Sequence, residues 1–209
     1  MLFLILCSRF VMAQNNNVSG KEFDENPKIH LGVKAGFSLS NLQSTELNNK
    51  SARPAMVVGL YGNYILNKKV TFQLEMNGIL KGANFHFSQA SSLQRLSLFY
   101  LDLPILLNYS TKKTSKIIPF SGILPSIILR KDAYKTQEAV PQPVDLDLKK
   151  YDFAFSAGVL FKINTSVGLQ LQVNYGIINI NNRLEIPFYP LLGNGNAMYN
   201  RNLQLSLVF

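Results

Sequence analysis

The feature that most constrains this chain is the alternation of apolar and polar residues at every second position. The last eleven residues, 199–209, show it most clearly, because their apolar and polar side chains separate onto two faces. One face holds Leu203, Leu205, Leu207 and Phe209, and the other holds Asn202, Gln204 and Ser206, with Val208 as its one apolar residue. Since the side chains of a β-strand alternate with period two, this segment predicts a strand with one apolar and one polar face.

The same pattern predicts seven further strands before this one. Their expected ranges are 30–40, 56–66, 70–82, 96–109, 116–129, 151–163 and 166–177. Pro119 and Pro125 interrupt the fifth range, and because proline cannot donate to a ladder we expect bulges or strand ends there. No segment after residue 13 reaches the roughly 18–20 consecutive apolar residues of a membrane helix. The chain is therefore predicted to be all-β and to form one domain.

Eight amphipathic strands fit two kinds of barrel. A soluble barrel turns its apolar face inward, whereas a membrane barrel turns it outward to lipid and lines its lumen with the polar face. The connections favour the membrane barrel: 41–54, 83–94, 130–150 and 178–198 are long and the others short, and transmembrane barrels have long extracellular loops and short periplasmic turns. The polar faces are rich in Gln, Asn, Ser and Gly and carry few charges.

Aromatic residues also gather at the ends of the apolar faces, where a membrane–water interface favours amphipathic rings. They are Tyr64, Tyr109, Tyr151, Phe161, Tyr175, Tyr199 and Phe209. Because lipid offers backbone groups no hydrogen bonds, the first and last strands must pair. We predict an eight-stranded antiparallel up-and-down transmembrane β-barrel of the outer-membrane type.

The N-terminal residues resemble a secretory signal. Residues 1–13, MLFLILCSRFVMA, have an apolar core and a small-residue end, although they lack a basic n-region and Arg9 interrupts them. A start codon placed too late would explain the missing n-region. The expected organisation is a signal peptide at 1–13, a flexible periplasmic tail at 14–28 and the barrel domain at 29–209. Export and a barrel together predict the outer membrane of a Gram-negative cell.

Composition argues against several classes of function. The formal net charge is +9, but lysine and arginine are scattered without a stripe of interleaved aromatics, which disfavours nucleic-acid binding. His30 and His86 lie far apart, and Cys7, the only cysteine, lies in the leader, so no metal site is expected. No Ser, His or Tyr stands at a spacing typical of an acid–base pair or a triad. We predict no catalytic residues and no cofactor.

The few charges on the polar faces are the candidate site. They are Lys34, Glu75, Lys81, Asp102, Asp152 and Lys162. The interior of an eight-stranded barrel is just filled by side chains, and a buried unpaired charge is costly. We therefore predict a luminal polar network of Lys34, Glu75, Lys81, Asp102 and Lys162, in which the carboxylates meet the lysines. A proton path or a catalytic carboxylate pair is the functional alternative.

The C-terminal strand carries a second candidate. Its terminal aromatic, preceded by apolar residues at alternate positions, resembles the signal that barrel-insertion machinery reads. The residues concerned are Leu203, Leu205, Leu207 and Phe209. We predict that this strand contacts the insertion machinery and that the barrel surface contacts outer-membrane lipid.

Four stretches resemble the PorT-like, or porin-family, outer-membrane β-barrel proteins of Bacteroidetes-type bacteria. They are LGVKAGFSLSNL at 31–42, QLEM at 73–76 with Lys81-Gly82, YLDLPILLNY at 100–109 and YGIINI at 175–180. The resemblance implies an eight-stranded barrel in the outer membrane, and the member that gives the family its name is associated with protein secretion.

Four functions are compatible with this reading. We expect a non-enzymatic barrel with a structural, surface-interaction or secretion and assembly role, in which the long loops meet a secretion or surface protein partner. A narrow porin-like channel for small solutes is the main alternative, although eight strands leave no wide aqueous channel. An outer-membrane enzyme and a soluble lipid-binding barrel are the remaining readings.

Overall fold

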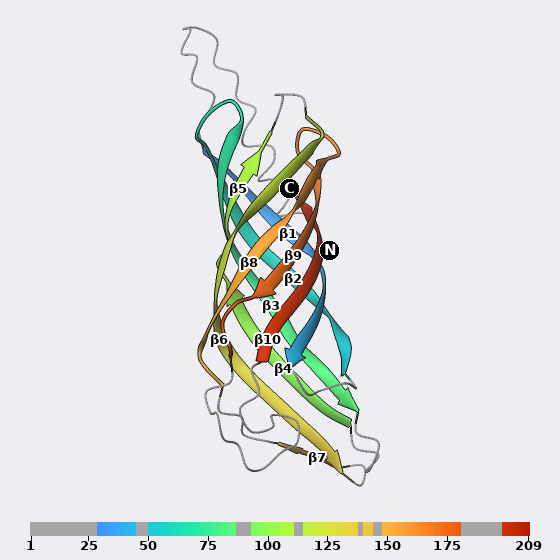
Figure 1. The fold of residues 1–209 in the computed structure, drawn as a ribbon. Coiled ribbons are helices and arrows are strands. Elements are labelled where there is room, and N and C mark those ends of the chain that lie inside the picture. Colours follow the sequence, from blue (N-terminus) through green and yellow to red (C-terminus); the bar gives the residue numbers. More distant parts are fainter. Residues whose placement is uncertain are drawn as a thin grey trace, which may run out of the picture.

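The described residues form one antiparallel sheet that closes on itself as a barrel (Figure 1). The computed structural model describes residues 29–44, 50–86, 93–110, 115–137, 140–143, 148–180 and 198–209. The expected leader at 1–13 and tail at 14–28 lie outside these residues. No helix in the described part of the chain is long and apolar enough to cross a membrane.

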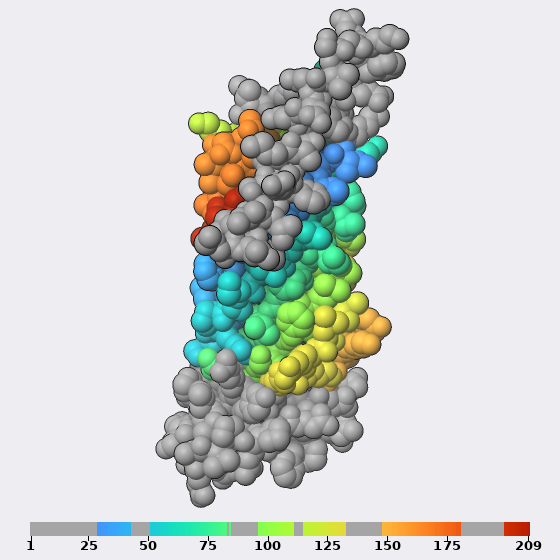
Figure 2. All heavy atoms as spheres, turned by 180° about the vertical axis from the view of Figure 1, so that it is seen from behind, coloured from blue at the N-terminus to red at the C-terminus, as the bar shows by residue number. Residues whose placement is uncertain are grey.

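Eight strand positions make up the wall, as predicted. In order around the barrel they are β1 (Ile29–Ser44), β2 (Lys50–Ile65), β3 (Val70–His86), β4 (Leu93–Asp102) with β5 (Ile105–Tyr109), β6 (Ile117–Gln137), β8 (Tyr151–Lys162), β9 (Gly168–Gly176) and β10 (Met198–Val208). The short β7 (Val140–Pro143) pairs with β6. Figure 2 shows β1, β2, β3, β4 and β6 following one another across one face as tilted bands, from blue through green to yellow.

The first and last strands close the barrel, which confirms the expected pairing. β1 and β10 are in register from Lys34 opposite Val208 to Ser44 opposite Met198. Beyond this ladder the Phe209 N–H donates to the Val33 carbonyl at 2.9 Å, and the Val33 N–H donates to the Phe209 carbonyl at 3.1 Å. No strand edge of the wall is therefore left to lipid, as a spanning sheet requires.

Several strands are longer than the alternation predicted, and one is broken. β1 runs to Ser44 and β2 begins at Lys50, so most of the expected loop 41–54 is strand. β6 continues to Gln137 and forms a hairpin with β7, so the expected loop 130–150 also contains strand. The expected single strand 96–109 is divided into β4 and β5 by Leu103 and Pro104.

The prolines of β6 are accommodated without a break in its ladder with β8. Pro119 and Pro125 stand opposite Val159 and Phe153 in an unshifted register. On the other side, Pro125 faces the gap between β4 and β5, where the Leu103 N–H donates to its carbonyl at 2.9 Å. Proline is thus tolerated because the missing N–H falls where the neighbouring strand is interrupted. The expectation of bulges or strand ends at these prolines was wrong, because the one register shift between β6 and β4 lies between Ile128 and Arg130.

Burial in this barrel is opposite to that in a soluble protein. The outward side chains are large and apolar, and Leu31, Phe37 and Val173 are 73%, 69% and 50% exposed. The inward side chains are mostly polar, and Lys34, Glu75 and Gln172 are at most 2% exposed. A contiguous apolar exterior of this extent would aggregate in water, so its natural solvent is lipid.

The two ends of the barrel differ. We call the end with the short connections 66–69, 110–116 and 163–167 the turn end, and the opposite end the loop end. The turn end lies at the top of Figure 1, and β7 lies at the bottom, at the loop end. Asn67 and Asn164 cap two of these turns, since each side-chain oxygen accepts two backbone N–H bonds at 2.7–2.9 Å.

Toward the loop end the polarity of the wall reverses. The inward residues become apolar and are buried: they are Leu42, Leu96, Leu98 and Ile128. Outward residues there include Arg130, whose side chain is 72% exposed, and Asp132. Leu148 and Ile180, which follow β7 and β9, are buried at this end as well, and the Lys149 N–H donates to the Ile180 carbonyl at 2.9 Å. An apolar inside with a charged outside is the pattern of a domain in water, so the barrel extends beyond the lipid at this end.

Candidate functional site in the barrel lumen

A buried ion pair lies at the centre of the lumen. Lys34 of β1 and Glu75 of β3 approach to 2.9 Å, and both side chains are 0% exposed. Glu75 accepts further hydrogen bonds from Gln73 at 2.5 Å and from Asn77 at 2.7 Å. Alternation along β1 and β3 turns these residues inward, and the charge-assisted bonds compensate for the loss of water around the two ions.

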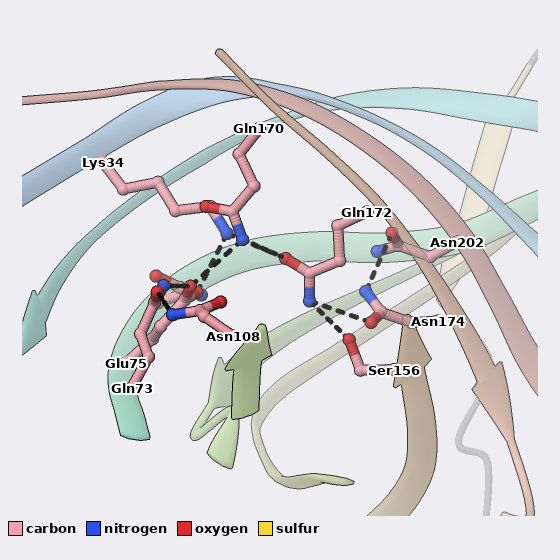
Figure 3. Close-up of polar contacts among 10 residues, drawn as sticks. Lys34, Gln73, Glu75, Asn108, Ser156, Gln170, Gln172, Asn174 and Asn202 are labelled. Carbon is pink, nitrogen blue, oxygen red and sulfur yellow. Dashed lines mark hydrogen bonds and ion pairs between the residues drawn. The ribbon is translucent and has the colours of Figure 1, made fainter. Parts of the chain in front are cut away.

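This network crosses the lumen to the far wall (Figure 3). The Gln170 side-chain amide donates to Glu75 at 3.2 Å, and the Lys34 ammonium donates to Gln172 at 2.9 Å. Gln170 and Gln172 belong to β9, which stands opposite β3 in the eight-membered order of the wall. These hydrogen bonds therefore bridge opposite walls at that level of the barrel.

The network continues from β9 onto β8 and β10, and from β3 onto β5. Gln172 donates to Ser156 of β8 at 2.9 Å and to Asn174 at 3.0 Å, and Asn174 donates to Asn202 of β10 at 3.4 Å. On the other side, Asn108 of β5 donates to Gln73 at 2.7 Å. The lumen is also narrow, because some Cα atoms of β3 and β10 lie within 8 Å of each other.

A second ion pair lies nearer the loop end. Lys81 and Asp102 approach to 2.8 Å, and the Lys81 ammonium also lies 4.3 Å from the centre of the Tyr100 ring. The Asn200 side chain donates to the Tyr100 hydroxyl at 2.8 Å and to Asp152 at 2.5 Å. Tyr100 on β4 and Asn200 on β10 come from opposite walls, so the lumen is bridged at a second level.

The structure brings four of the five predicted network residues into two separate pairs and leaves out the fifth. Lys162, the last residue of β8, is exposed at the turn end, where its N–H donates to the Lys116 carbonyl. Its position in the alternation is inward, but the strand ends there and the long side chain reaches water. Lys162 therefore does not join the luminal pairs.

Arg53 is a buried charge that the sequence reasoning missed. It is 8% exposed, and its guanidinium donates to the Leu96 carbonyl at 3.1 Å. Arg53 fell in an expected loop, yet extending the alternation of β2 backwards from Val57 through Ala55 reaches it. Among the described buried residues, Lys34, Arg53 and Lys81 balance Glu75, Asp102 and Asp152, so these six charges sum to zero.

Some luminal atoms have no hydrogen-bond partner among the described residues. They include Ser38 Oγ, Gln204 Oε1 and Ser206 Oγ on the β1–β10 side of the barrel. Ser38 stands opposite Gln204 in the register, and Ser206 stands opposite Gln170, a partner in the first bridge. Polar groups of this kind favour bound water. Within the described part of the chain, no group of three or more His, Cys, Asp or Glu could hold a metal ion.

The predicted insertion residues point outward along β10. Leu203, Leu205, Leu207 and Phe209 are between 41% and 47% exposed. The Phe209 carbonyl also accepts a hydrogen bond from the Tyr61 hydroxyl at 3.1 Å. The end of the Tyr61 side chain lies close to Gly32, since a Cβ at that glycine would come within 2.4 Å of the Tyr61 Cζ. The C-terminus is thus fixed at the turn end, and its apolar edge faces lipid.

Solved structures with a similar fold are outer-membrane barrels. Neisserial surface protein A is 12% identical, with a TM-score of 0.50, and the match covers 86% of this chain and 97% of that chain. OprG from Pseudomonas aeruginosa (13% identity, TM-score 0.47, 86% and 95% covered) and Ail from Yersinia pestis (10% identity, TM-score 0.47, 86% and 97% covered) are also similar. A comparison with curated proteins found no match.

The sequence also matches a family directly. The family described as outer membrane protein beta-barrel domain matches residues 12–182, which is more than half of the chain. The closed eight-position barrel, its lipid-facing apolar wall and its polar lumen agree with that description. This chain belongs to the outer membrane protein beta-barrel domain family and is an integral protein of the outer membrane.

Proposed function

We propose that the protein is a closed, non-conducting and non-enzymatic barrel that presents its loop end outside the cell as an interaction surface. The observation that carries this proposal is the pair of bridges between opposite walls, Glu75 with Gln170 and Tyr100 with Asn200. A barrel closed at two levels cannot pass solutes through its centre. Its function must then lie on its surface.

The loop end supports the interaction role. The strands there continue beyond the lipid, and buried apolar residues such as Leu98 and Ile180 give the extension a core of its own. β6 and β7 carry this extension furthest from the barrel (Figure 1). Such a scaffold positions extracellular residues rigidly, as a binding surface requires. A role in secretion or assembly, as in the PorT-like proteins that the sequence resembles, would use this same surface.

A narrow porin-like channel is the second candidate. The unpartnered luminal atoms Ser38 Oγ, Gln204 Oε1 and Ser206 Oγ favour it, because they would hydrogen-bond well to water. Ser206 lies beside Gln170 of the first bridge, however, so a continuous path of water would have to pass that bridge.

Planar-bilayer recording separates the closed barrel from the channel. The purified protein is expected to show no steady ion conductance, with a sixteen-stranded porin as the positive control. The double variant Tyr100→Ala/Gln170→Ala removes one partner of each bridge and is expected to admit small ions. Steady openings of the unaltered protein, permeable to small solutes, would contradict the closed-barrel proposal.

Phe209 is proposed to serve in membrane insertion. Deleting Phe209 is expected to lower the yield of inserted barrel in cells, because both the terminal aromatic and its backbone bonds to Val33 are lost. Phe209→Ala is the matched variant, since it keeps the backbone bonds and removes only the ring. Heat-modifiable mobility of membrane fractions measures insertion. If both variants insert normally, the C-terminal residues are only the apolar and polar alternation of a strand and not an insertion signal.

A further inference from the structure

The charges outside the lumen are distributed unequally between the two ends. The turn-end segments 66–69, 110–116 and 162–167 contain six lysines and no Asp or Glu. The loop-end connections 45–49, 138–150 and 177–197 contain five acidic and three basic residues. The described acidic residues do not offset the turn-end lysines, because Glu75, Asp102 and Asp152 are buried in the lumen and Asp132 lies at the loop end.

Four of these lysines are described, and all four are exposed. They are Lys68, Lys69, Lys116 and Lys162. Backbone bonds place them on adjacent parts of the rim: the Ser110 N–H donates to the Lys69 carbonyl at 2.7 Å, and the Lys162 N–H to the Lys116 carbonyl at 2.7 Å. The turn end therefore carries a continuous cationic rim over the connections of β2–β3, β5–β6 and β8–β9.

Aromatic side chains mark where this rim lies relative to the membrane. Tyr64, Tyr109, Phe161 and Phe209 point outward just inside the lysines and are between 38% and 46% exposed. Rings of this kind sit at the headgroup level of a bilayer. Lys162 follows Phe161 directly, and Lys68 and Lys69 follow Tyr64 by four and five residues, so their flexible stems reach the phosphate level.

We propose that the cationic rim binds the phosphate groups of anionic phospholipids in the periplasmic leaflet. Outer-membrane barrels place their short turns on the periplasmic side, so this rim meets phospholipid there. Basic residues next to a membrane surface attract anionic lipids, and none of these four lysines forms an ion pair with a described Asp or Glu. The rim would hold a shell of phosphatidylglycerol-like lipids around the turn end.

The test uses the full-length protein inserted into preformed vesicles with its turn end outside, an orientation checked by protease access to an N-terminal tag. Spin-labelled phosphatidylglycerol or phosphatidylcholine is exchanged into the outer leaflet only. The fraction of motionally restricted label then gives the preference of the barrel for each lipid. The unaltered protein is expected to prefer phosphatidylglycerol, and about 1 M salt is expected to abolish that preference by screening.

The variants form a matched pair. Lys68→Gln/Lys69→Gln is expected to lower the preference about fivefold or more. Lys149→Gln/Lys150→Gln removes the same charge from exposed lysines at the loop end and is expected to leave it unchanged. Circular dichroism verifies that both variants keep the barrel.

Three outcomes would overturn the proposal. The unaltered protein could show no preference for phosphatidylglycerol, or the two double variants could change that preference equally. In the third, Lys68→Gln/Lys69→Gln would lose binding to purified cell wall and keep its lipid preference. The last outcome would assign the rim to an anionic cell-wall polymer instead. None of these outcomes depends on whether the lumen conducts, so this proposal and the closed-barrel proposal can fail separately.

Discussion

Substituting Glu75 with glutamine is expected to lower the free energy of unfolding by about 3–5 kcal/mol. The change keeps the size of the side chain but leaves the Lys34 ammonium without its carboxylate, in a site where both side chains are fully buried. Four donors converge on Glu75, from Lys34, Gln73, Asn77 and Gln170. A carboxylate accepts all four bonds, whereas an amide has one acceptor oxygen and would turn its NH₂ group toward other donors.

Urea unfolding of the barrel in phospholipid vesicles measures this loss. The double variant Lys34→Met/Glu75→Gln is expected to be more stable than the sum of the two single effects implies, because it removes the uncompensated ammonium. Asp132→Asn is the matched control. Arg130 and Asp132 also approach to 2.9 Å, but the Arg130 side chain is 72% exposed, so we expect a cost below about 1 kcal/mol. If the effects of Lys34→Met and Glu75→Gln were additive, burial would not determine the strength of the Lys34–Glu75 pair. The same would follow if Glu75→Gln and Asp132→Asn lowered the free energy of unfolding equally.

The alternation of residues was enough to predict the barrel and the side of its wall on which most residues lie. Leu31 and Phe37 face outward and Gln73 and Gln172 inward because period two and a lipid exterior leave no other arrangement. The strand ends were predicted less well, since the polarity reverses where the wall leaves the lipid. Leu42 is an inward apolar residue in a strand whose earlier apolar residues face outward, so the pattern appeared to end before it.

The pairing of charges could not be predicted from the sequence. Alternation places Lys34, Glu75, Lys81 and Asp102 in the lumen, but it does not fix the stagger of one strand against the next. Lys34 and Glu75 lie on β1 and β3, with β2 between them, and the small Gly59 beside Lys34 in the register lets the two side chains meet. Arg53 was missed because its strand was predicted to begin only at residue 56, and Lys162 was misplaced because it lies at a strand end.

Leu171→Arg is expected to cost about 2–4 kcal/mol if Leu171 lies near the middle of the bilayer. On β9 it stands between Leu169, toward the turn end, and Tyr175, toward the loop end, and it is 38% exposed on the lipid side. Its neighbours in the register are Leu205 and Val159, which are apolar and also face outward. An arginine at this position has no acceptor within the wall and must draw water or headgroups toward it.

The control for Leu171→Arg has to change charge without entering the lipid. Gln172→Arg, an inward change on the same strand, is unsuitable, because Gln172 accepts a bond from Lys34 and an arginine there would face a second cation in the lumen. Ser166→Arg is the better control, because Ser166 is exposed in the turn before β9 and the added charge stays in water. We expect a change within about 0.5 kcal/mol at this position.

Leu171→Gln completes the test, because it adds polarity at the same site without charge. If lipid covers this face, the glutamine also destabilises the barrel in vesicles, since an amide in hydrocarbon lacks hydrogen-bond partners. If the face met water, Leu171→Gln and Leu171→Arg would both be nearly neutral, because an exposed leucine contributes little to folding. The urea midpoints of the three variants, compared at an unchanged dependence on urea concentration, therefore test whether Leu171 faces lipid. Midpoints close to that of the unaltered protein for both Leu171 variants would show that it does not.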